Sequence, residues 1–227
     1  MDLKLELKGV RYSKKVVIVD YQLGNLFSVQ HACKKIGIMA EVSSDVKVIN
    51  EADALILPGV GAFGDAMKNV LELNLIEPIK NAIASGKPFF GICLGMQLLF
   101  DSSEEFGNYK GLGIIPGAIR KFPMEFQGLS LRVPQISWNK VFLSDSLNEW
   151  TDTPLSTTVI NEYMYFVHSY YVMPESEEHV LCKTDYNGFQ YCSGVNVKNV
   201  FAVQFHPEKS GEKGLQVYRN WANQNLI

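Results

Sequence analysis

Short apolar runs at four places constrain the fold of this chain more than any other feature of its sequence. They are VVIVD (16–20), DALIL (53–57), KPFFGI (87–92) and VFAVQF (200–205). Runs of this length bounded by turn residues are typical of buried strands. Stretches with helical periodicity follow the first three, at residues 25–37, 65–86 and 94–105, with Pro78 interrupting the second. This alternation predicts a parallel sheet with helices on both faces.

The chain changes character after about residue 110. Short β-rich segments punctuated by Gly, Pro or Asn predict antiparallel strands that extend the sheet or pack beside it, at residues 111–122, 131–141, 163–173, 179–186 and 189–197. Residues 214–224 predict a closing helix. The fold class is therefore α/β, with a mostly parallel central sheet, helices on both faces and an antiparallel β-rich extension. We expect one domain over residues 16–227, preceded by an extension (1–15) that forms a short edge strand or is mobile.

Composition excludes several classes of partner. The formal net charge of −3 gives no general attraction to nucleic acid or anionic membranes, and no apolar stretch approaches the roughly 18 residues of a membrane span. The four cysteines show no C-x-x-C spacing, and the first residues do not resemble a signal peptide, which favours a reduced, cytoplasmic setting. The four histidines show no metal-ligand pattern, so we expect neither a metal nor another cofactor.

The segment Gly91–Gly95 reads G-x-C-x-G between a predicted strand and a predicted helix. It is the thiol counterpart of the nucleophile elbow, in which glycines allow a tight corner that exposes the central side chain. A helix beginning after Cys93 favours the thiolate, and the Leu94 N–H is placed to stabilise an oxyanion. The alternative is that Cys93 is a small buried residue that only packs the corner.

A partner for this cysteine occurs at the last predicted strand, in VQFHPEKS. We expect Pro207 to keep the chain extended, so that His206 and Glu208 face the same side and the carboxylate orients the imidazole. A strand end with an exposed acid is the alternative. Together with the cysteine elbow, the pair predicts a Cys-His-Glu triad for nucleophilic catalysis.

The motifs GICLGMQLLF and QFHPEKS resemble those of the class I (triad) glutamine amidotransferases, which have a flavodoxin-like core. PGVGAFGDAM and YFVHSYY narrow the resemblance to the glutaminase subunits of imidazole glycerol phosphate synthases, from about residue 16 to the C-terminus. The resemblance implies that Cys93 attacks the side-chain amide of glutamine and forms a thioester, releasing ammonia. It also implies that His206 is the base and then the acid, and that Glu208 orients it.

The resemblance assigns further residues to the substrate site. Gln97 would help to hold glutamine, and Glu105 would contact its ammonium group, with Glu104 as the neighbour that could be confused with it. The backbone of His168, Ser169 and Tyr170 would hold the carboxylate. In the family the loop after the second strand motif supplies a second oxyanion donor through a peptide that can reorient, which assigns Gly59, Val60 and Gly61 here.

The same loop spells G-x-G-x-x-G at Gly59, Gly61 and Gly64, the spacing of a dinucleotide-binding fingerprint. That alternative, an oxidoreductase, is weak. The fingerprint follows the wrong strand, because the first βαβ unit starts near Val16, and no acidic residue stands at a strand end about 20 residues later to bind a ribose.

The resemblance implies a heterodimer with a (β/α)8 cyclase that receives the ammonia, and residues matching the docking face are Asn25, Trp138 and Asn139. A tryptophan buried in the core is the alternative for Trp138. The docking segments depart from the family pattern at Gln22, Leu23, Gln135, Ile136 and Ser137. A paralogous glutaminase serving a surface-polysaccharide sugar amidotransferase therefore remains open, as does a catalytically silent regulatory module.

Overall fold

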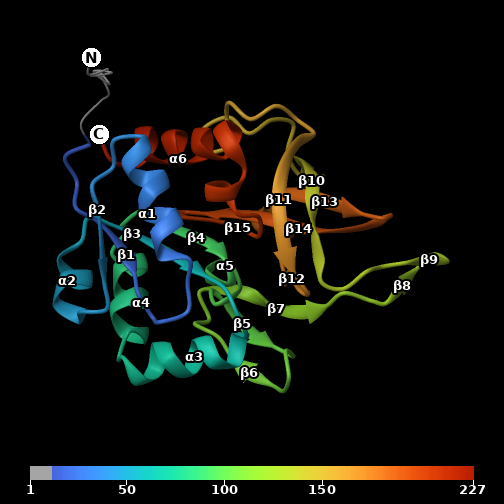
Figure 1. The fold of residues 1–227 in the computed structure, drawn as a ribbon, viewed down its shortest axis with the longest axis horizontal. Helices are drawn as coiled ribbons and strands as arrows, with labels where there is room; N and C mark the ends of the chain where they lie inside the picture. Colours follow the sequence, from blue (N-terminus) through green and yellow to red (C-terminus); the bar gives the residue numbers. More distant parts are fainter. Residues whose placement is uncertain (1–11) are drawn as a thin grey trace, which may run out of the picture.

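Five parallel strands form the centre of the molecule in this computed structural model, which describes residues 12–227 (Figure 1). In spatial order they are β2 (Ala40–Ser43), β1 (Val16–Val19), β3 (Ala54–Gly59), β4 (Phe89–Cys93) and β15 (Val200–Val203). Every neighbouring pair among them is parallel. The four apolar runs are thus four of these strands, and β1, β3, β4 and β15 are buried along their whole length.

Helices cover both faces of this parallel sheet, as the periodicity predicts. Figure 1 shows one pair above the sheet, α1 (Leu26–Lys35) and α6 (Gly211–Asn225). Below it lie α3 (Phe63–Glu72) and α4 (Ile76–Ala84), with α2 (Val46–Glu51) beside them. Alternate residues of β1 serve the two cores: Val17 and Val19 pack with the α2–α4 side, whereas Val16 and Ile18 pack with α1 and α6.

The predicted helical stretch 65–86 is two helices rather than one. The chain turns between α3 and α4 at Asn74, which has a φ of 56°. Pro78 stands in the first turn of α4, where a proline lacks no hydrogen bond that the helix would otherwise form.

Mostly antiparallel strands continue the sheet beyond β15 and bring it to 13 strands, although β5 and β7 pair in parallel. The continuation runs through β14 (Phe189–Val197), β12 (Tyr170–Pro174), β7 (Ile115–Lys121), β5 (Phe100–Ser103) and β6 (Tyr109–Lys110). A branch leaves β14 through β13 (Val180–Tyr186) to β10 (Gln135–Leu143) and β11 (Glu162–His168). A separate hairpin, β8 (Glu125–Phe126) with β9 (Leu129–Ser130), projects at the right of Figure 1. The predicted β-rich extension is confirmed.

Two parts of the sequence-based description need adjustment. The helix expected over residues 94–105 is only α5 (Leu94–Gln97), because the chain enters β5 three residues later. Residues 1–11 of the predicted extension lie outside the described part of the chain. Of the remainder, Tyr12 and Lys14 hydrogen-bond to Asn223 and Asn225 of α6. The boundary of the domain at residue 16 stays a prediction.

Candidate active site

The backbone at Cys93 forms a sharp corner between β4 and α5. Cys93 has φ 55° and ψ −110°, a conformation that side-chain-bearing residues rarely adopt. The flanking glycines are required by close packing: a methyl group on Gly95 would overlap the carbonyl of Leu57, and one on Gly91 would lie 2.9 Å from the Cβ of Ala202. The corner therefore has the geometry of a nucleophile elbow, and its sulfur lines a cavity.

His206 and Glu208 approach this corner from the loop after β15. The Nδ1 of His206 lies 2.8 Å from Oε1 of Glu208, and their side chains are 2% and 1% exposed. The expectation that an extended chain brings them together is wrong. His206 is itself extended, as a residue before proline must be, but Pro207–Lys209 form a 3₁₀ turn. It is this turn that returns the carboxylate to the imidazole.

The electrostatics favour a protonated imidazole at His206. Burial alone lowers the pKa of His206, but the charge and hydrogen bond of Cys93 and those of Glu208 outweigh burial and raise this pKa to about 10. The proton therefore stays on the imidazole near neutral pH. An anionic sulfur is the nucleophilic form of a cysteine.

The Nε2 of Gln204, a residue that the sequence analysis missed, donates to Sγ of Cys93 at 3.5 Å. Its Oε1 accepts from Nε2 of Gln97 at 3.0 Å. Both amides are buried. The only available signal in the sequence was the position of Gln204 two residues before His206. An amide donor on the sulfur stabilises the thiolate.

A cavity of about 390 Å³ opens over the sulfur. It is lined by residues from β4, α5, β11 and β12 and from nearby loops, namely Val60, Gly61, Cys93, Leu94, Gln97, Glu105, Pro134, Val167, His168, Ser169, Tyr170 and Lys209. Every residue predicted for substrate binding is thus at one site. Pro134, Val167 and Lys209 are additions that sequence reasoning did not identify.

The structure distinguishes the two adjacent glutamates. Glu105 lines the cavity, and its Oε2 accepts the N–H of Phe63 at 2.7 Å. Glu104 instead pairs with Arg120 at 2.9 Å and accepts the N–H of Lys121, away from the cavity. Burial raises the pKa of Glu105, although the Phe63 N–H opposes this. A cation in the cavity would find its countercharge at Glu105.

The predicted oxyanion loop lies beside the nucleophile, because Gly59 is the register partner of Cys93. A side chain on Gly59 would overlap the hydroxyl of Tyr21, so close packing demands glycine there. The N–H of Val60 is occupied, since it donates to the Leu23 carbonyl at 3.3 Å. The peptide that carries this N–H joins Gly59 to Val60, so the absence of a side chain at Gly59 eases its reorientation. Gly61, which follows, has a φ of 105°. In this structure the Val60 N–H is therefore turned away from the cavity.

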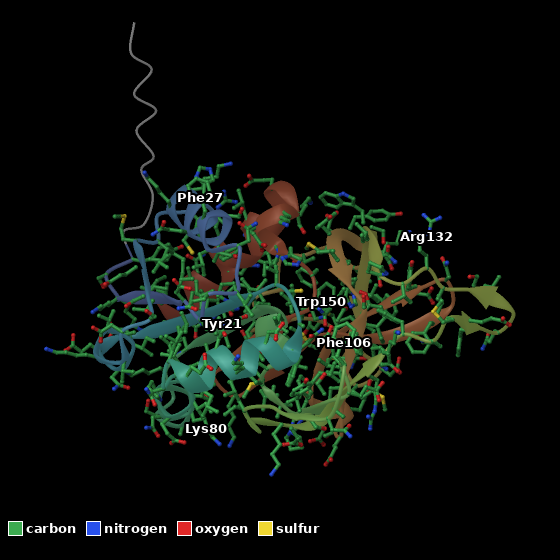
Figure 2. All side chains as sticks on the ribbon, turned by 60° about the horizontal axis from the view of Figure 1, so that its bottom comes forward. Tyr21, Phe27, Lys80, Phe106, Arg132 and Trp150 are labelled. Atoms are coloured by element: carbon green, nitrogen blue, oxygen red, sulfur yellow. The ribbon has the colours of Figure 1, made fainter. Side chains whose placement is uncertain are left out.

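The predicted docking residues differ in how far they are exposed. Trp138 is 50% exposed and packs edge-on against Tyr165, with ring centroids 5.9 Å apart, so it is not a core tryptophan. Asn25 is half-buried, and Asn139 binds within the chain, donating to the Asp185 carbonyl at 2.9 Å. Phe27 projects from α1 and is 78% exposed (Figure 2).

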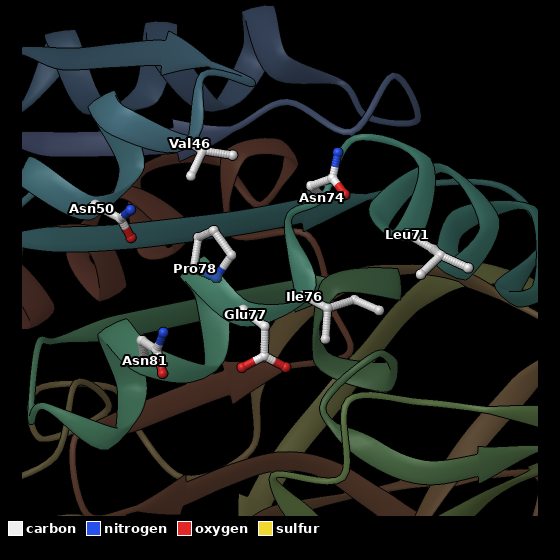
Figure 3. Close-up of a pocket in the computed structure, with 8 residues that line it drawn as sticks. All are labelled: Val46, Asn50, Leu71, Asn74, Ile76, Glu77, Pro78 and Asn81. Carbon is white, nitrogen blue, oxygen red and sulfur yellow. The ribbon is translucent and has the colours of Figure 1, made fainter.

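A larger cavity, about 470 Å³, lies elsewhere, between α2 and the α3–α4 region (Figure 3). Glu77 is the one titratable side chain in its lining, beside Asn50, Asn74, Asn81 and apolar groups. Its lining holds no cysteine, serine, threonine, lysine or histidine, whereas the smaller cavity holds Cys93.

Residues 12–227 contain neither a cluster of metal-binding side chains nor a membrane-spanning helix. Within this range no three His, Cys, Asp or Glu side chains group so as to hold a metal ion. None of the helices described there is long and apolar enough to cross a membrane.

Comparison with known proteins agrees with this geometry. The family model "Glutamine amidotransferase class-I" matches residues 17–224. The imidazole glycerol phosphate synthase subunit HisH of Aquifex aeolicus is 47% identical over 208 residues, covering 91% of this chain and 95% of that protein. The HisH subunit of Syntrophotalea carbinolica is 46% identical over 211 residues, covering 92% and 99%.

Solved structures share the fold at lower identity. A crystal structure of a glutamine amidotransferase superposes with a TM-score of 0.70 at 18% identity, covering 93% of this chain and 99% of that one. PurLQS from Thermotoga maritima gives 0.69 at 21% identity, covering 92% and 98%. The elbow, the paired histidine and glutamate, and these matches lead to one conclusion: the chain belongs to the class-I glutamine amidotransferase family.

Proposed function

We propose that this chain is the glutaminase subunit of an imidazole glycerol phosphate synthase and acts in histidine biosynthesis. The observation that carries the proposal is Cys93 at the elbow, in a cavity that Glu105 and Gln97 also line, together with the buried His206–Glu208 pair whose imidazole pKa Cys93 raises. The names of the relatives, 47% and 46% identical over nearly their whole length, support the pathway. They do not support a dinucleotide-binding oxidoreductase.

The thiolate of Cys93 attacks the side-chain carbonyl carbon of glutamine, and the carbon–nitrogen bond breaks in the tetrahedral intermediate. The imidazolium of His206 gives its proton to the departing nitrogen, so ammonia leaves and a glutamyl thioester remains. The neutral imidazole then takes a proton from water, whose oxygen attacks the thioester. Glutamate leaves, and the protonated imidazole again faces the thiolate. Glu208 keeps the imidazole oriented throughout.

Glutamine binds with its ammonium group at Glu105 and its carboxylate at the backbone of residues 168–170. The N–H groups of Leu94 and Val60 stabilise the oxyanion. The second of these donors requires that the bond from Val60 to the Leu23 carbonyl break. Leu23 lies two residues from Asn25 on the proposed docking face, so association with the partner is placed to assemble the site.

The proposed partner is a (β/α)8 cyclase subunit that forms a heterodimer with this chain and receives the ammonia. Exposed Trp138 and Phe27 are suitable anchors, because aromatic side chains are enriched at interfaces. The reaction's setting is proposed to be the cytoplasm, in keeping with four free cysteines.

The experiment measures glutamate release from glutamine by the wild type and by Cys93→Ala, alone and with a histidine-pathway cyclase plus its ribonucleotide substrate. We expect strong stimulation by the cyclase and no activity in the variant. Stimulation by a sugar amidotransferase instead would leave the glutaminase chemistry but refute the pathway. Absence of Cys93-dependent hydrolysis with either partner would refute the enzymatic function.

A further inference from the structure

A chain of buried hydrogen bonds begins at Gln135, a residue outside the cavity. Its Oε1 lies 3.0 Å from the hydroxyl of Tyr191, which is 3.2 Å from Nε2 of His168. The Nδ1 of His168 lies 2.8 Å from the carbonyl oxygen of Tyr170. Gln135 is fully buried, and the side chains of the other three residues are buried as well. The chain therefore connects Gln135 to the backbone that lines the glutamine cavity.

The same carbonyl continues the chain to the nucleophile. The Nε2 of Gln97 donates to the Tyr170 carbonyl at 3.1 Å and also to Oε1 of Gln204 at 3.0 Å. The Nε2 of Gln204 donates to Sγ of Cys93 at 3.5 Å. The Tyr170 carbonyl oxygen is thus held by two groups, the imidazole of His168 and the side-chain amide of Gln97. Gln97 in turn binds Gln204, the donor to the sulfur.

The chemistry of the groups gives the first part of the chain a direction. Burial lowers the pKa of His168 to about 4, so the ring is neutral and carries one N–H. The Tyr170 carbonyl can only accept, which places that proton on Nδ1 and makes Nε2 an acceptor. The hydroxyl of Tyr191 must then donate to Nε2. Its oxygen is left to accept from Gln135.

This direction also explains an unpaired group. With Oε1 of Gln135 toward Tyr191, the buried Nε2 has no partner. The two ends of a glutamine amide are assigned from their hydrogen-bond partners. Turning the amide by 180° lets Nε2 donate to the Tyr191 oxygen and leaves an unpaired carbonyl, a group that structures tolerate better than an unpaired N–H.

Gln135 begins β10, and its register partner on β11 is His168. The next outward residues of β10 include Trp138 of the proposed docking face. The strand that carries the docking tryptophan thus also carries the last group of the buried chain. A change of residue type at position 135 acts on the cavity without touching glutamine.

We propose that Gln135 is a positioning residue for glutamine hydrolysis, acting through Tyr191 and His168 on the backbone carbonyl of Tyr170. The inference rests on the proposed function, because it assigns the 168–170 backbone to the substrate carboxylate. Loss of the amide donor frees the imidazole and lets this backbone shift. The consequence is weaker binding of glutamine rather than loss of the nucleophile.

The test compares Gln135→Leu, Tyr191→Phe, their double variant and Gln135→His, which keeps an N–H donor. Thr153→Val is the matched control, since it removes a buried hydroxyl that donates to the Trp150 carbonyl at 2.7 Å, outside the chain of bonds. Glutamate release, at saturating cyclase partner and its substrate, gives kcat and KM, and thermal unfolding gives stability.

Gln135→Leu and Tyr191→Phe are each expected to raise the KM for glutamine about 5- to 10-fold with kcat within about 2-fold. The double variant should raise the KM by about the same factor as each single variant, not by the product of the two factors. The reason is that both substitutions break the same chain of hydrogen bonds. Gln135→His should have a KM for glutamine close to that of the wild type. Thr153→Val should lower the thermal stability without changing the KM.

Two results would overturn the inference with wild-type activity intact. One is a KM unchanged in Gln135→Leu. The other is a KM raised equally in Thr153→Val, which would show that any buried cavity or lost hydrogen bond has this effect. A wild type without Cys93-dependent hydrolysis would instead refute the proposed function and this inference with it.

Discussion

Replacing Glu208 by Gln keeps the shape of the side chain but removes its charge, and it should move the basic limb of the pH–rate profile. His206 must be protonated to deliver a proton to the departing nitrogen, so activity falls as pH rises through the pKa of that group. With this pKa at about 10, the wild-type limb lies near pH 10. The variant should lose activity at a lower pH.

The size of the change follows from the geometry. The pKa of about 10 against an ordinary value of 6.5 corresponds to about 5 kcal/mol in favour of the imidazolium. Cys93 and Glu208 both contribute to this free energy, and Glu208 does so through its buried 2.8 Å contact with His206. A charged hydrogen bond contributes about 1.5–3 kcal/mol, so the limb should fall by about one to two pH units. The imidazole then stays protonated at neutral pH, and the loss of kcat/KM should appear at alkaline pH, reaching about 5- to 50-fold at pH 10.

The raised pKa has a matching effect on folding. Its contribution to the free energy of unfolding is complete below about pH 6.5 and is lost as pH rises through about 10. In Glu208→Gln the contribution should be smaller, and its loss should be complete at a lower pH. Chemical denaturation at several pH values measures it.

The assay is glutamate release between about pH 6 and pH 10.5 at saturating partner. The control is Glu212→Gln, because Glu212 is an exposed acid on α6 that pairs with Arg219 instead. A basic limb that stays in place in Glu208→Gln, or that moves equally in Glu212→Gln, would refute the assignment of the imidazolium to the Glu208 contact.

Three further changes have expected outcomes. Glu105→Gln should raise the KM for glutamine about 10-fold or more, whereas Glu104→Gln, whose carboxylate faces Arg120, should not; equal effects in steady-state kinetics would contradict the pocket assignment. Gly59→Ala should lower the melting temperature, since the methyl overlaps the Tyr21 hydroxyl, by the equivalent of about 1–3 kcal/mol. Trp138→Ala should weaken binding of the cyclase by about 30-fold or more in calorimetry, and an unchanged affinity would remove Trp138 from the interface.

Local sequence patterns were sufficient to predict most strands and helices of the parallel core. Buried runs such as 53–57 and 87–92 are strands because their apolar side chains face helices on both sides of the sheet. The elements without a prediction, β2 and α2, lack such signals. The first is a half-buried edge strand, and the second has six residues, too few for helical periodicity to be recognised.

The site was predictable where its geometry is local. The corner at Cys93 follows from two glycines with no space for a side chain. The Gln204–Cys93 contact and the bond from Val60 to Leu23 join segments far apart in the sequence, and only the strand order brings them together. The contact between His206 and Glu208 was predicted correctly but for the wrong reason. An extended backbone was expected at Pro207, whereas a 3₁₀ turn over Pro207–Lys209 brings the two side chains together.

The free edge of β11 has a consequence for the synthesis of the chain. β11 pairs with β10 on one side only, and on its other side the Tyr165 carbonyl accepts from the His206 N–H at 2.9 Å. The Tyr165 N–H donates to the hydroxyl of Ser210 at 3.0 Å. A nascent chain that has not reached residue 206 leaves this aromatic strand edge uncovered, and open edges of that kind pair with other molecules. The turn that carries His206 and Glu208 is thus also the segment that covers this strand edge, and it is made after β11 because it follows β11 in the chain.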